Sequence, residues 1–348
     1  FTPRGIESYF STIHNDGLWM QQRWEGLAAS GETVEMIDEM MMVTASIILK
    51  TMFSMDSDED ILELKGAVET MIRYITISQT NPLYPPLWVP TRTNRAYLRA
   101  KQEVHTYING VIAQRRAIPE DEWPDDLLSK LMLAEDEETG ERMSDELLRD
   151  ESLTIFFAGH ETTATTLTFL WYSLATNPEV EARLHAEIDA VLGDGPLTLE
   201  QVGELEYTLQ VVKETLRLYP AAPTYVRDAV EDDEIDGYHI PAGSRMMLWP
   251  FLTHRHPDFW ERPEAFDPDR WEPACEKARH PYAFHAFAAG QRTCLGNNFS
   301  LFESQVLVAL LARHFAPRLA VPGFTPEVEM AGTLTSSNGL PMRITKRP

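Results

Sequence analysis

The sequence predicts a mainly α-helical fold with a minor β region, organised as one helix-rich domain. Two observations predict the secondary structure: apolar residues recur at helical spacing through the first two thirds of the chain, and short strand-like runs with turn signals appear only later. A third observation predicts the domain count, because no internal repeat and no linker divides the 348 residues.

The first helices are expected at Val34 to Phe53, Ile61 to Ile77 and Asn94 to Arg115, where apolar side chains would share one helix face. Proline-rich chain from 81 to 90 and an acidic loop from 135 to 142 interrupt the pattern. These interruptions mark the boundaries between the predicted helices.

A long helix is expected to start at an N-cap, Ser144, and to stop before Asn177-Pro178. Its sequence is apolar nearly all round, which predicts a buried helix. Pro178 then opens another helix, which is expected to end at Gly193.

The remaining elements follow from local signals. The segment Thr198 to Gln201 has the spacing of a capping box for a helix that ends at Tyr219. Short strands are expected between residues 224 and 245. A last helix would run through His314, and Ser337-Asn338-Gly339 predicts a terminal hairpin.

The charge and the cysteine content exclude several classes of protein. The chain has 54 acidic and 30 basic residues and a net charge of −24, which disfavours binding to nucleic acid or to an anionic membrane surface. Its two cysteines, Cys275 and Cys294, form no CxxC pair, so the sequence predicts no disulfide framework and no zinc site. No apolar run approaches the roughly 18 residues of a membrane span.

The segment from Phe287 to Gly296, FAAGQRTCLG, fits FxxGxRxCxG at all five specified positions. The glycines Gly290 and Gly296 permit a tight turn and a close approach of the backbone to a flat ligand. A helix beginning near Gly296 would direct its free N–H groups toward Cys294 and favour the thiolate, which is the form that binds metal. Iron held by one thiolate favours O–O cleavage, and Arg292 would neutralise a haem propionate. The alternative is a buried free cysteine beside a helix start.

Inside the long helix, the segment from Ala158 to Thr163, AGHETT, places a glycine, an acid and a hydroxyl on an apolar face. Such a placement costs stability, so a local widening of the helix and a proton route are indicated. The alternatives are that Thr162 bonds back to the preceding turn and that Glu161 lies on a solvated face. His160 is expected to be a packed or partly exposed histidine and not a ligand.

Two further motifs carry charge. Glu214 and Arg217 form an ExxR that places opposite charges on one helix face. The segment from Pro263 to Trp271, which contains Arg270, follows it. Arg227 stands on a predicted strand, where it is either a ligand-pairing residue or an ordinary surface arginine.

The cysteine loop resembles the haem-binding signature of the cytochrome P450 family. The order of the motifs is also similar to the family's: acid–alcohol helix, ExxR, Arg–Trp segment, cysteine loop. Two departures are Ala286, where the family often has Pro, and Ala288, where it often has Gly. The resemblance implies the cytochrome P450 fold around haem b, iron protoporphyrin IX, with an axial thiolate from Cys294.

The resemblance also implies roles for the other residues. Thr162 would hydrogen-bond dioxygen and Glu161 would supply protons, while Glu214, Arg217 and Arg270 would lock the chain that supports the cysteine loop. The haem contacts would be Cys294, Arg292, Phe287, Gly290, Gly296, Arg227 and Ala158. The substrate contacts would be Ile155, Phe156, Pro223, Thr224, Tyr225, Leu334 and Thr335, unless several of these are plain core residues. They suggest an apolar ligand such as a fatty acid, terpenoid or steroid.

The resemblance implies a monooxygenase that uses O2 and takes electrons from a separate ferredoxin or flavoprotein reductase. Two alternatives stay open: a peroxide-driven peroxygenase of the same fold and a non-catalytic haem or ligand carrier. Roughly the first quarter of a typical member precedes the residue that matches Phe1, so a membrane anchor in that region also stays open. The expected location is cytoplasmic and bacterial.

Overall fold

The fold is helix-rich with small sheets, as the sequence predicts. The computed structural model describes residues 3–54, 66–68, 70–71, 73–75, 77–78, 81 and 83–347. Of the helix predicted at Ile61 to Ile77, residues 66–68, 70–71, 73–75 and 77 are described and helical, and the others lie outside the described residues. None of the described helices is long and apolar enough to cross a membrane.

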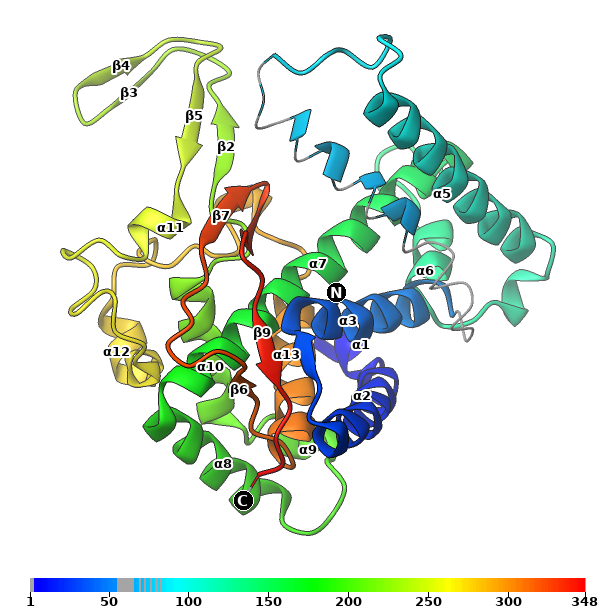
Figure 1. Ribbon diagram of the computed structural model, residues 1–348. Helices are drawn as coiled ribbons and strands as arrows, with labels where there is room; N and C mark the ends of the chain where they lie inside the picture. Colours follow the sequence, from blue (N-terminus) through cyan, green and yellow to red (C-terminus); the bar gives the residue numbers. More distant parts are fainter. Residues whose placement is uncertain are drawn as a thin grey trace.

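Twelve labelled helices are described. They are α1 (Pro3–Glu7), α2 (Phe10–Ser30), α3 (Met36–Phe53), α5 (Arg92–Arg116), α6 (Leu127–Leu133), α7 (Asp145–Thr176), α8 (Pro178–Leu192), α9 (Leu199–Val202), α10 (Glu206–Leu218), α11 (Pro250–Thr253), α12 (Pro273–Ala278) and α13 (Asn297–Ala312). Figure 1 shows α7 running through the middle of the helical body.

The described strands form small antiparallel sheets. They are β1 (Thr33–Glu35), β2 (Tyr225–Asp228), β3 (Asp233–Ile235), β4 (Tyr238–Ile240), β5 (Arg245–Leu248), β6 (Arg318–Leu319), β7 (Val328–Ala331), β8 (Thr333–Ser336) and β9 (Pro341–Arg343). One sheet has the order β1-β9-β6, and the others are the pairs β2-β5, β3-β4 and β7-β8. The strands predicted between residues 224 and 245 are confirmed, and their two ribbons project from the helical body (Figure 1).

Local capping explains why several helix boundaries are predictable. The Ser144 hydroxyl accepts a hydrogen bond from the N–H of Leu147 and caps α7. The helix α8 begins at Pro178 and ends before Gly193, which confirms the prediction. The capping box of Thr198 and Gln201 is also present.

The helix predicted from Thr198 to Tyr219 is two helices, α9 and α10, because contacts from other helices stabilise a break between them. Gln305 of α13 donates from its side-chain amide to the carbonyl of Leu205, at 3.2 Å, and this carbonyl also accepts the N–H of Leu209 at 3.1 Å. The carboxylate of Glu187 accepts the N–H and the hydroxyl of Thr208, at 2.8 and 2.7 Å, and caps the start of α10. Both partners are distant in sequence.

The prediction of a terminal hairpin at Ser337-Asn338-Gly339 is wrong. The turn is present, but β8 pairs with β7 while β9 pairs with β1 and β6. Gly339 adopts a left-handed φ of 72°, and the next N–H, from Leu340, donates to the Glu35 carboxylate at 2.8 Å. The Leu340 carbonyl accepts the N–H of Met36 at 3.1 Å. These bonds draw the chain away from β8 and toward β1.

The core forms where α7 packs against α3, α10 and α13. Trp171 of α7 lies edge-on to Trp24 of α2, with 5.3 Å between the ring centroids. A Cβ at Gly159 would lie 2.9 Å from Cδ1 of Ile48 on α3. The mid-helix glycine therefore has a packing role, since it lets α3 approach α7 closely.

Buried Glu303 makes stability depend on pH. Its two carboxyl oxygens have no hydrogen-bond partner among the described residues. Burial, with a smaller contribution from Asp16, raises the pKa of Glu303 well above the ordinary value of 4.5. The folded state therefore keeps a proton that the unfolded chain loses, so the stability that this proton gives falls as the pH rises above 4.5.

We expect Glu303→Gln to raise the melting temperature more at pH 8 than at pH 4.5, because glutamine cannot ionise. Thermal unfolding followed by circular dichroism would measure both differences, with exposed Glu138→Gln as the control. The same shift at both pH values would contradict a protonated Glu303.

Candidate active site

The cysteine loop is built by short-range backbone bonds. The N–H of Cys294 donates to the carbonyl of Phe287 at 2.8 Å, which closes the loop. The N–H and the hydroxyl of Thr293 both donate to the Gly290 carbonyl, at 3.1 and 2.7 Å. Gly296 is the N-cap of α13, and Cys294 is exposed. The loop therefore presents its thiol beside a helix N-terminus.

The loop contains two left-handed residues. Gly290 has a φ of 74° and Ala288 a φ of 58°. A glycine adopts this conformation freely, whereas a side chain with a Cβ is strained there. The departure from the family pattern at Ala288 is thus a strained position.

Glu214 and Arg217 form a buried ion pair in which both side chains are 0% exposed. Arg217 donates from Nε and Nη2 to the two carboxylate oxygens, at 2.9 and 2.8 Å. Its remaining donors reach the carbonyls of His254, Pro263 and Ala265, at 2.8, 2.6 and 2.9 Å. One guanidinium thereby holds irregular chain that has no sheet or helix to satisfy its carbonyls.

The Glu214 carboxylate accepts the remaining hydrogen bonds of this network. Its carboxylate accepts the N–H of Asp267 at 2.9 Å and the indole N–H of Trp271 at 3.0 Å. Nε of Arg270 lies 3.4 Å from the same carboxylate. The structure therefore brings together the three charged residues that the sequence analysis grouped, Glu214, Arg217 and Arg270.

His254 and His285 connect this network to the cysteine loop, and the sequence analysis missed both. His254 is 0% exposed. Its Nδ1 lies 3.1 Å from the Arg217 carbonyl, and its Nε2 accepts the N–H of His285 at 3.0 Å. Neither histidine stands in a recognisable motif, so the only sequence signal was the proximity of His285 to Phe287.

The acid and the alcohol on α7 have different surroundings. The Thr162 hydroxyl donates to the Ala158 carbonyl at 2.7 Å, which is the backbone-bonded alternative left open by the sequence. Glu161 is half-buried and accepts the hydroxyl of Thr333, from β8, at 2.7 Å. Burial raises the pKa of Glu161, and the Thr333 hydrogen bond opposes that rise. Glu161 is therefore not on a fully solvated face.

His160 is packed inside the protein. It is buried, stacks on Phe156 with 4.7 Å between centroids, and places Nδ1 2.9 Å from the Phe156 carbonyl. Burial lowers the pKa of His160. Its own carbonyl accepts the hydroxyl of Thr44 at 3.0 Å, so α3 contacts the helix one residue before Glu161.

A hydroxyl pair joins the acid–alcohol segment to the helix that follows the cysteine. Thr163, next to Thr162, lies 3.1 Å from Ser300 between side-chain oxygens. Ser300 belongs to the first turn of α13, where its N–H donates to the Gly296 carbonyl at 2.9 Å. The structure thus places the start of α13 against the acid–alcohol segment of α7.

Arg227 fits an anionic ligand. Its Nη2 is buried and has no hydrogen-bond partner among the described residues, whereas Nη1 donates to the Val226 carbonyl at 2.9 Å. Its guanidinium lies 4.8 Å from the ring centroid of Tyr225, whose hydroxyl lies 3.1 Å from Nδ1 of His285. An unpaired guanidinium donor, an exposed Cys294 thiol and an exposed Ala158 on α7 together suit a flat cofactor with carboxylates.

The predicted substrate contacts divide into two groups. Phe156 is in the main core, and Ile155 packs against it. Leu334 is bonded through its N–H to the Ala221 carbonyl at 2.9 Å, which places β8 beside the segment that holds Pro223, Thr224 and Tyr225. Leu334 and Thr335 also line a cavity of about 160 Å³ with Ile37, Thr165, Thr168, Phe169, Ser336, Gly339 and Leu340.

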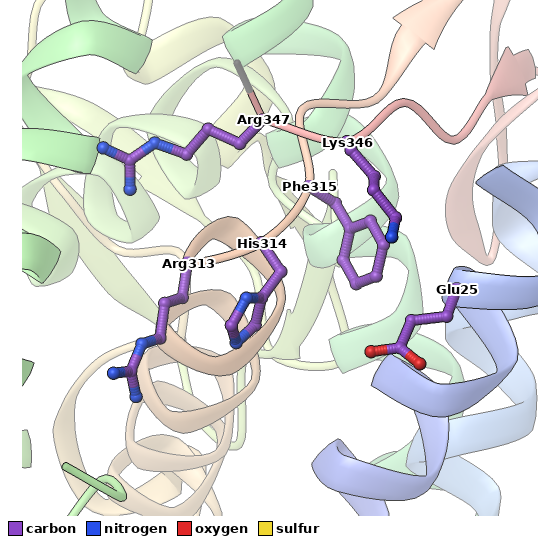
Figure 2. Close-up of a pocket in the computed structure, with 6 residues that line it drawn as sticks. All are labelled: Glu25, Arg313, His314, Phe315, Lys346 and Arg347. Carbon is purple, nitrogen blue, oxygen red and sulfur yellow. The ribbon is translucent and has the colours of Figure 1, made fainter. Parts of the chain in front are cut away.

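A larger cavity, of about 340 Å³, lies away from this site (Figure 2). It is lined by Glu25, Arg313, His314, Phe315, Lys346 and Arg347. It lies beyond the far end of α13, whose 16 residues span about 24 Å. Arg313 donates to the carbonyls of Gly193 and Gly195, each at 2.6 Å, and Arg347 pairs with Asp189. Arg347 thus binds the C-terminal segment to α8, and Arg313 binds the end of α13 to the turn that follows α8.

Comparison with known proteins agrees with the sequence resemblance. A family model described as cytochrome P450 matches residues 1–340. Cyclooctatin synthase of Streptomyces melanosporofaciens is 32% identical over 316 residues, which are 90% of this chain and 68% of that protein. Cyclooctat-9-en-7-ol 5-monooxygenase of the same species is 34% identical, over 93% of this chain and 69% of that protein.

Two further matches are a longer relative and a solved structure. Cytochrome P450 4V2 of Mus musculus is 35% identical over 71% of this chain, and the chain spans only 51% of that protein. The crystal structure of the cytochrome P450DA heme domain superposes with a TM-score of 0.89 at 30% identity. That superposition covers 99% of this chain and 74% of the solved one.

We expect Ala288→Gly to stabilise the protein by about 0.5–1 kcal/mol, because it relieves the left-handed strain at a small cost in chain entropy. Urea unfolding would measure the change. The matched control is Ala289→Gly, since Ala289 has an extended φ of −156° and should gain nothing. Equal effects at the two alanines would contradict the strain argument.

We expect Arg217→Lys to destabilise the fold by about 3 kcal/mol or more, since a lysine cannot replace a bidentate, fully buried guanidinium. Arg183→Lys is the control, because its pair with Asp269 is exposed and should change stability by about 0.5 kcal/mol or less. Urea unfolding would measure both losses. A comparable loss of unfolding free energy in the two variants would contradict the claim that the buried ion pair stabilises the fold more than the exposed one.

Proposed function

Because the chain belongs to the cytochrome P450 family, we propose that it is a haem-thiolate monooxygenase that inserts one oxygen atom from O2 into an apolar organic substrate. The observation that best supports this proposal is the exposed Cys294 at the N-terminus of α13. Its loop is closed by the hydrogen bond from the Cys294 N–H to the Phe287 carbonyl. The bond between Thr163 and Ser300 puts the acid–alcohol segment of α7 beside that helix.

The proposed cofactor is haem b with Cys294 as its axial ligand. Arg227 and Arg292 would pair with its propionates, and the closest contacts would come from Phe287, Gly290, Gly296 and Ala158. The unpaired, buried Nη2 of Arg227 supports this assignment. When bound, haem supplies the redox chemistry and the activation of oxygen. The protein supplies the thiolate, the orientation and the proton route.

Glu161 and Thr162 are the proposed proton-transfer residues. A half-buried carboxyl with a raised pKa holds its proton to a higher pH than an exposed one, which is the direction that a general acid needs. Thr162 uses its hydrogen on the Ala158 carbonyl, so its oxygen is free to accept a hydrogen bond from a bound molecule. Thr333 holds the Glu161 carboxyl in one direction.

The proposed substrate is an apolar molecule of the fatty acid, terpenoid or steroid class. Leu334 and the buried Pro223 are both apolar. The N–H of Leu334 donates to the carbonyl of Ala221, two residues before Pro223, so the two apolar residues belong to segments that are bonded to each other. One relative is named for a monooxygenase reaction on cyclooctat-9-en-7-ol, which agrees with an apolar substrate. We assign electron delivery to a ferredoxin or flavoprotein reductase. The cytoplasmic, bacterial location stays a prediction.

We expect Thr162→Ala and Glu161→Gln each to lower substrate oxidation driven by O2 and redox partners by about 100-fold, because proton delivery fails. Product formation and NADPH-dependent oxygen uptake would both be measured. Thr176→Ala is the control, since this exposed threonine makes the same kind of backbone bond, to Tyr172, at the end of α7.

The same variants separate the alternatives. A peroxygenase would give peroxide-driven product with wild-type protein and with Thr162→Ala, and no product from O2 and redox partners. A carrier would bind haem or ligand and take up no oxygen with any partner. Either result would contradict the proposed monooxygenase.

A further inference from the structure

The two ring nitrogens of His254 are used in opposite senses. Nε2 lies 3.0 Å from the backbone N of His285, and Nδ1 lies 3.1 Å from the backbone O of Arg217. A backbone N–H only donates and a carbonyl only accepts, so Nε2 must be bare and Nδ1 must carry the hydrogen. Burial, with further contributions from nearby charged groups, lowers the pKa of His254 to about 3, which agrees with this neutral form.

The ring is also fixed by packing. It stacks on Phe284 with 5.0 Å between centroids and an angle of 26° between planes, and it lies edge-on to Trp260 at 6.5 Å. The His254 carbonyl accepts Nη1 of Arg217 at 2.8 Å. Backbone and side chain of His254 are therefore both bonded to Arg217.

His285 is the residue at which the chain enters the cysteine loop. Its N–H is held by His254, and its carbonyl accepts the N–H of Ala288 at 3.0 Å. Phe287 then closes the loop by accepting the N–H of Cys294 at 2.8 Å. Hydrogen bonds, joined by the backbone of His285 and by the Phe287–Ala288 peptide, thus connect Arg217 through His254 to Cys294.

His254 provides this link between the buried ion pair and the loop. In the described part of the chain, no hydrogen bond joins Glu214, Arg217 or Arg270 directly to residues 285–296. The side chain of His285 adds a second link, because its Nδ1 lies 3.1 Å from the hydroxyl of Tyr225. The same peptide is thus tied to the network and to β2, the strand of Arg227.

We propose that His254 is a positioning residue that fixes the first peptide of the cysteine loop and so aims the Cys294 thiolate at the haem iron. This inference rests on the proposed function. Without the imidazole, a buried carbonyl and a buried N–H would both lose their partners. The loop would then shift to find new ones, and a metal ligand must be held to within about 0.5 Å.

The test compares three side chains at position 254. His254→Phe keeps the stacked ring and removes both nitrogens. His254→Gln restores one donor and one acceptor at a similar reach, and His254→Asn is one bond shorter. His239→Phe, at an exposed histidine of β4, is the matched control. The first readout is the reduced carbon monoxide difference spectrum of the haem-loaded protein, which separates thiolate-ligated haem from haem that has lost the thiolate.

We expect His254→Phe to lose most of the red-shifted thiolate band, His254→Gln to recover more of it than His254→Asn, and His239→Phe to match wild type. The second readout is amide hydrogen exchange in peptides that cover residues 284–296, which does not depend on activity. The His285 amide should exchange about tenfold faster in His254→Phe.

Several results would overturn the inference. One is an unchanged thiolate band in His254→Phe together with unchanged exchange at His285. If His254→Phe does not fold, equal bands in wild type, His254→Gln and His254→Asn would also overturn it. A wild-type protein with no thiolate band would refute the proposed function itself, while faster exchange in His254→Phe would still support the structural link.

Discussion

A carboxylate and a guanidinium that are both withdrawn from water must find all their hydrogen bonds inside the protein. Glu214 and Arg217 do so by bonding to the irregular chain from His254 to Trp271. That chain is ordered locally by turns and by one short 3₁₀ helix, Pro268–Trp271, and the ion pair adds the longer-range bonds that a sheet would otherwise give. His254 extends the order to the peptide before the cysteine loop.

The loop combines this imposed order with features of its own. The turn places Cys294 next to the start of α13, and the strained φ of 58° at Ala288 persists because bonds on both sides hold it. α13 in turn contacts α7 through Ser300 and Thr163. The acid and the alcohol are thus carried by α7, and the thiol is carried by the loop that leads into α13, the helix that contacts α7.

The sequence predicts well whatever depends on neighbouring residues. Ser144, Pro178 and the capping box at Thr198 act within one helical turn, so those boundaries follow from local chemistry. The turn at Gly339 is also local, but its strand partners are not: Leu340 bonds to Glu35, 305 residues away. No spacing rule reports such a contact, which is why the hairpin prediction fails.

The candidate site shows the same division. The FxxGxRxCxG spacing and the ExxR pair are readable because each motif lies within a short stretch of sequence. The bond of Glu161 to Thr333 spans 172 residues, and His254 reaches His285 and Arg217 across 31 and 37. The direction of the Glu161 carboxyl and the importance of His254 therefore required the fold. The most direct test of the central claim is the reduced carbon monoxide difference spectrum of wild type beside Cys294→Ser. Thiolate ligation predicts a red-shifted band in wild type that disappears in the variant, and its absence from wild type or its persistence in the variant would contradict the assignment of Cys294.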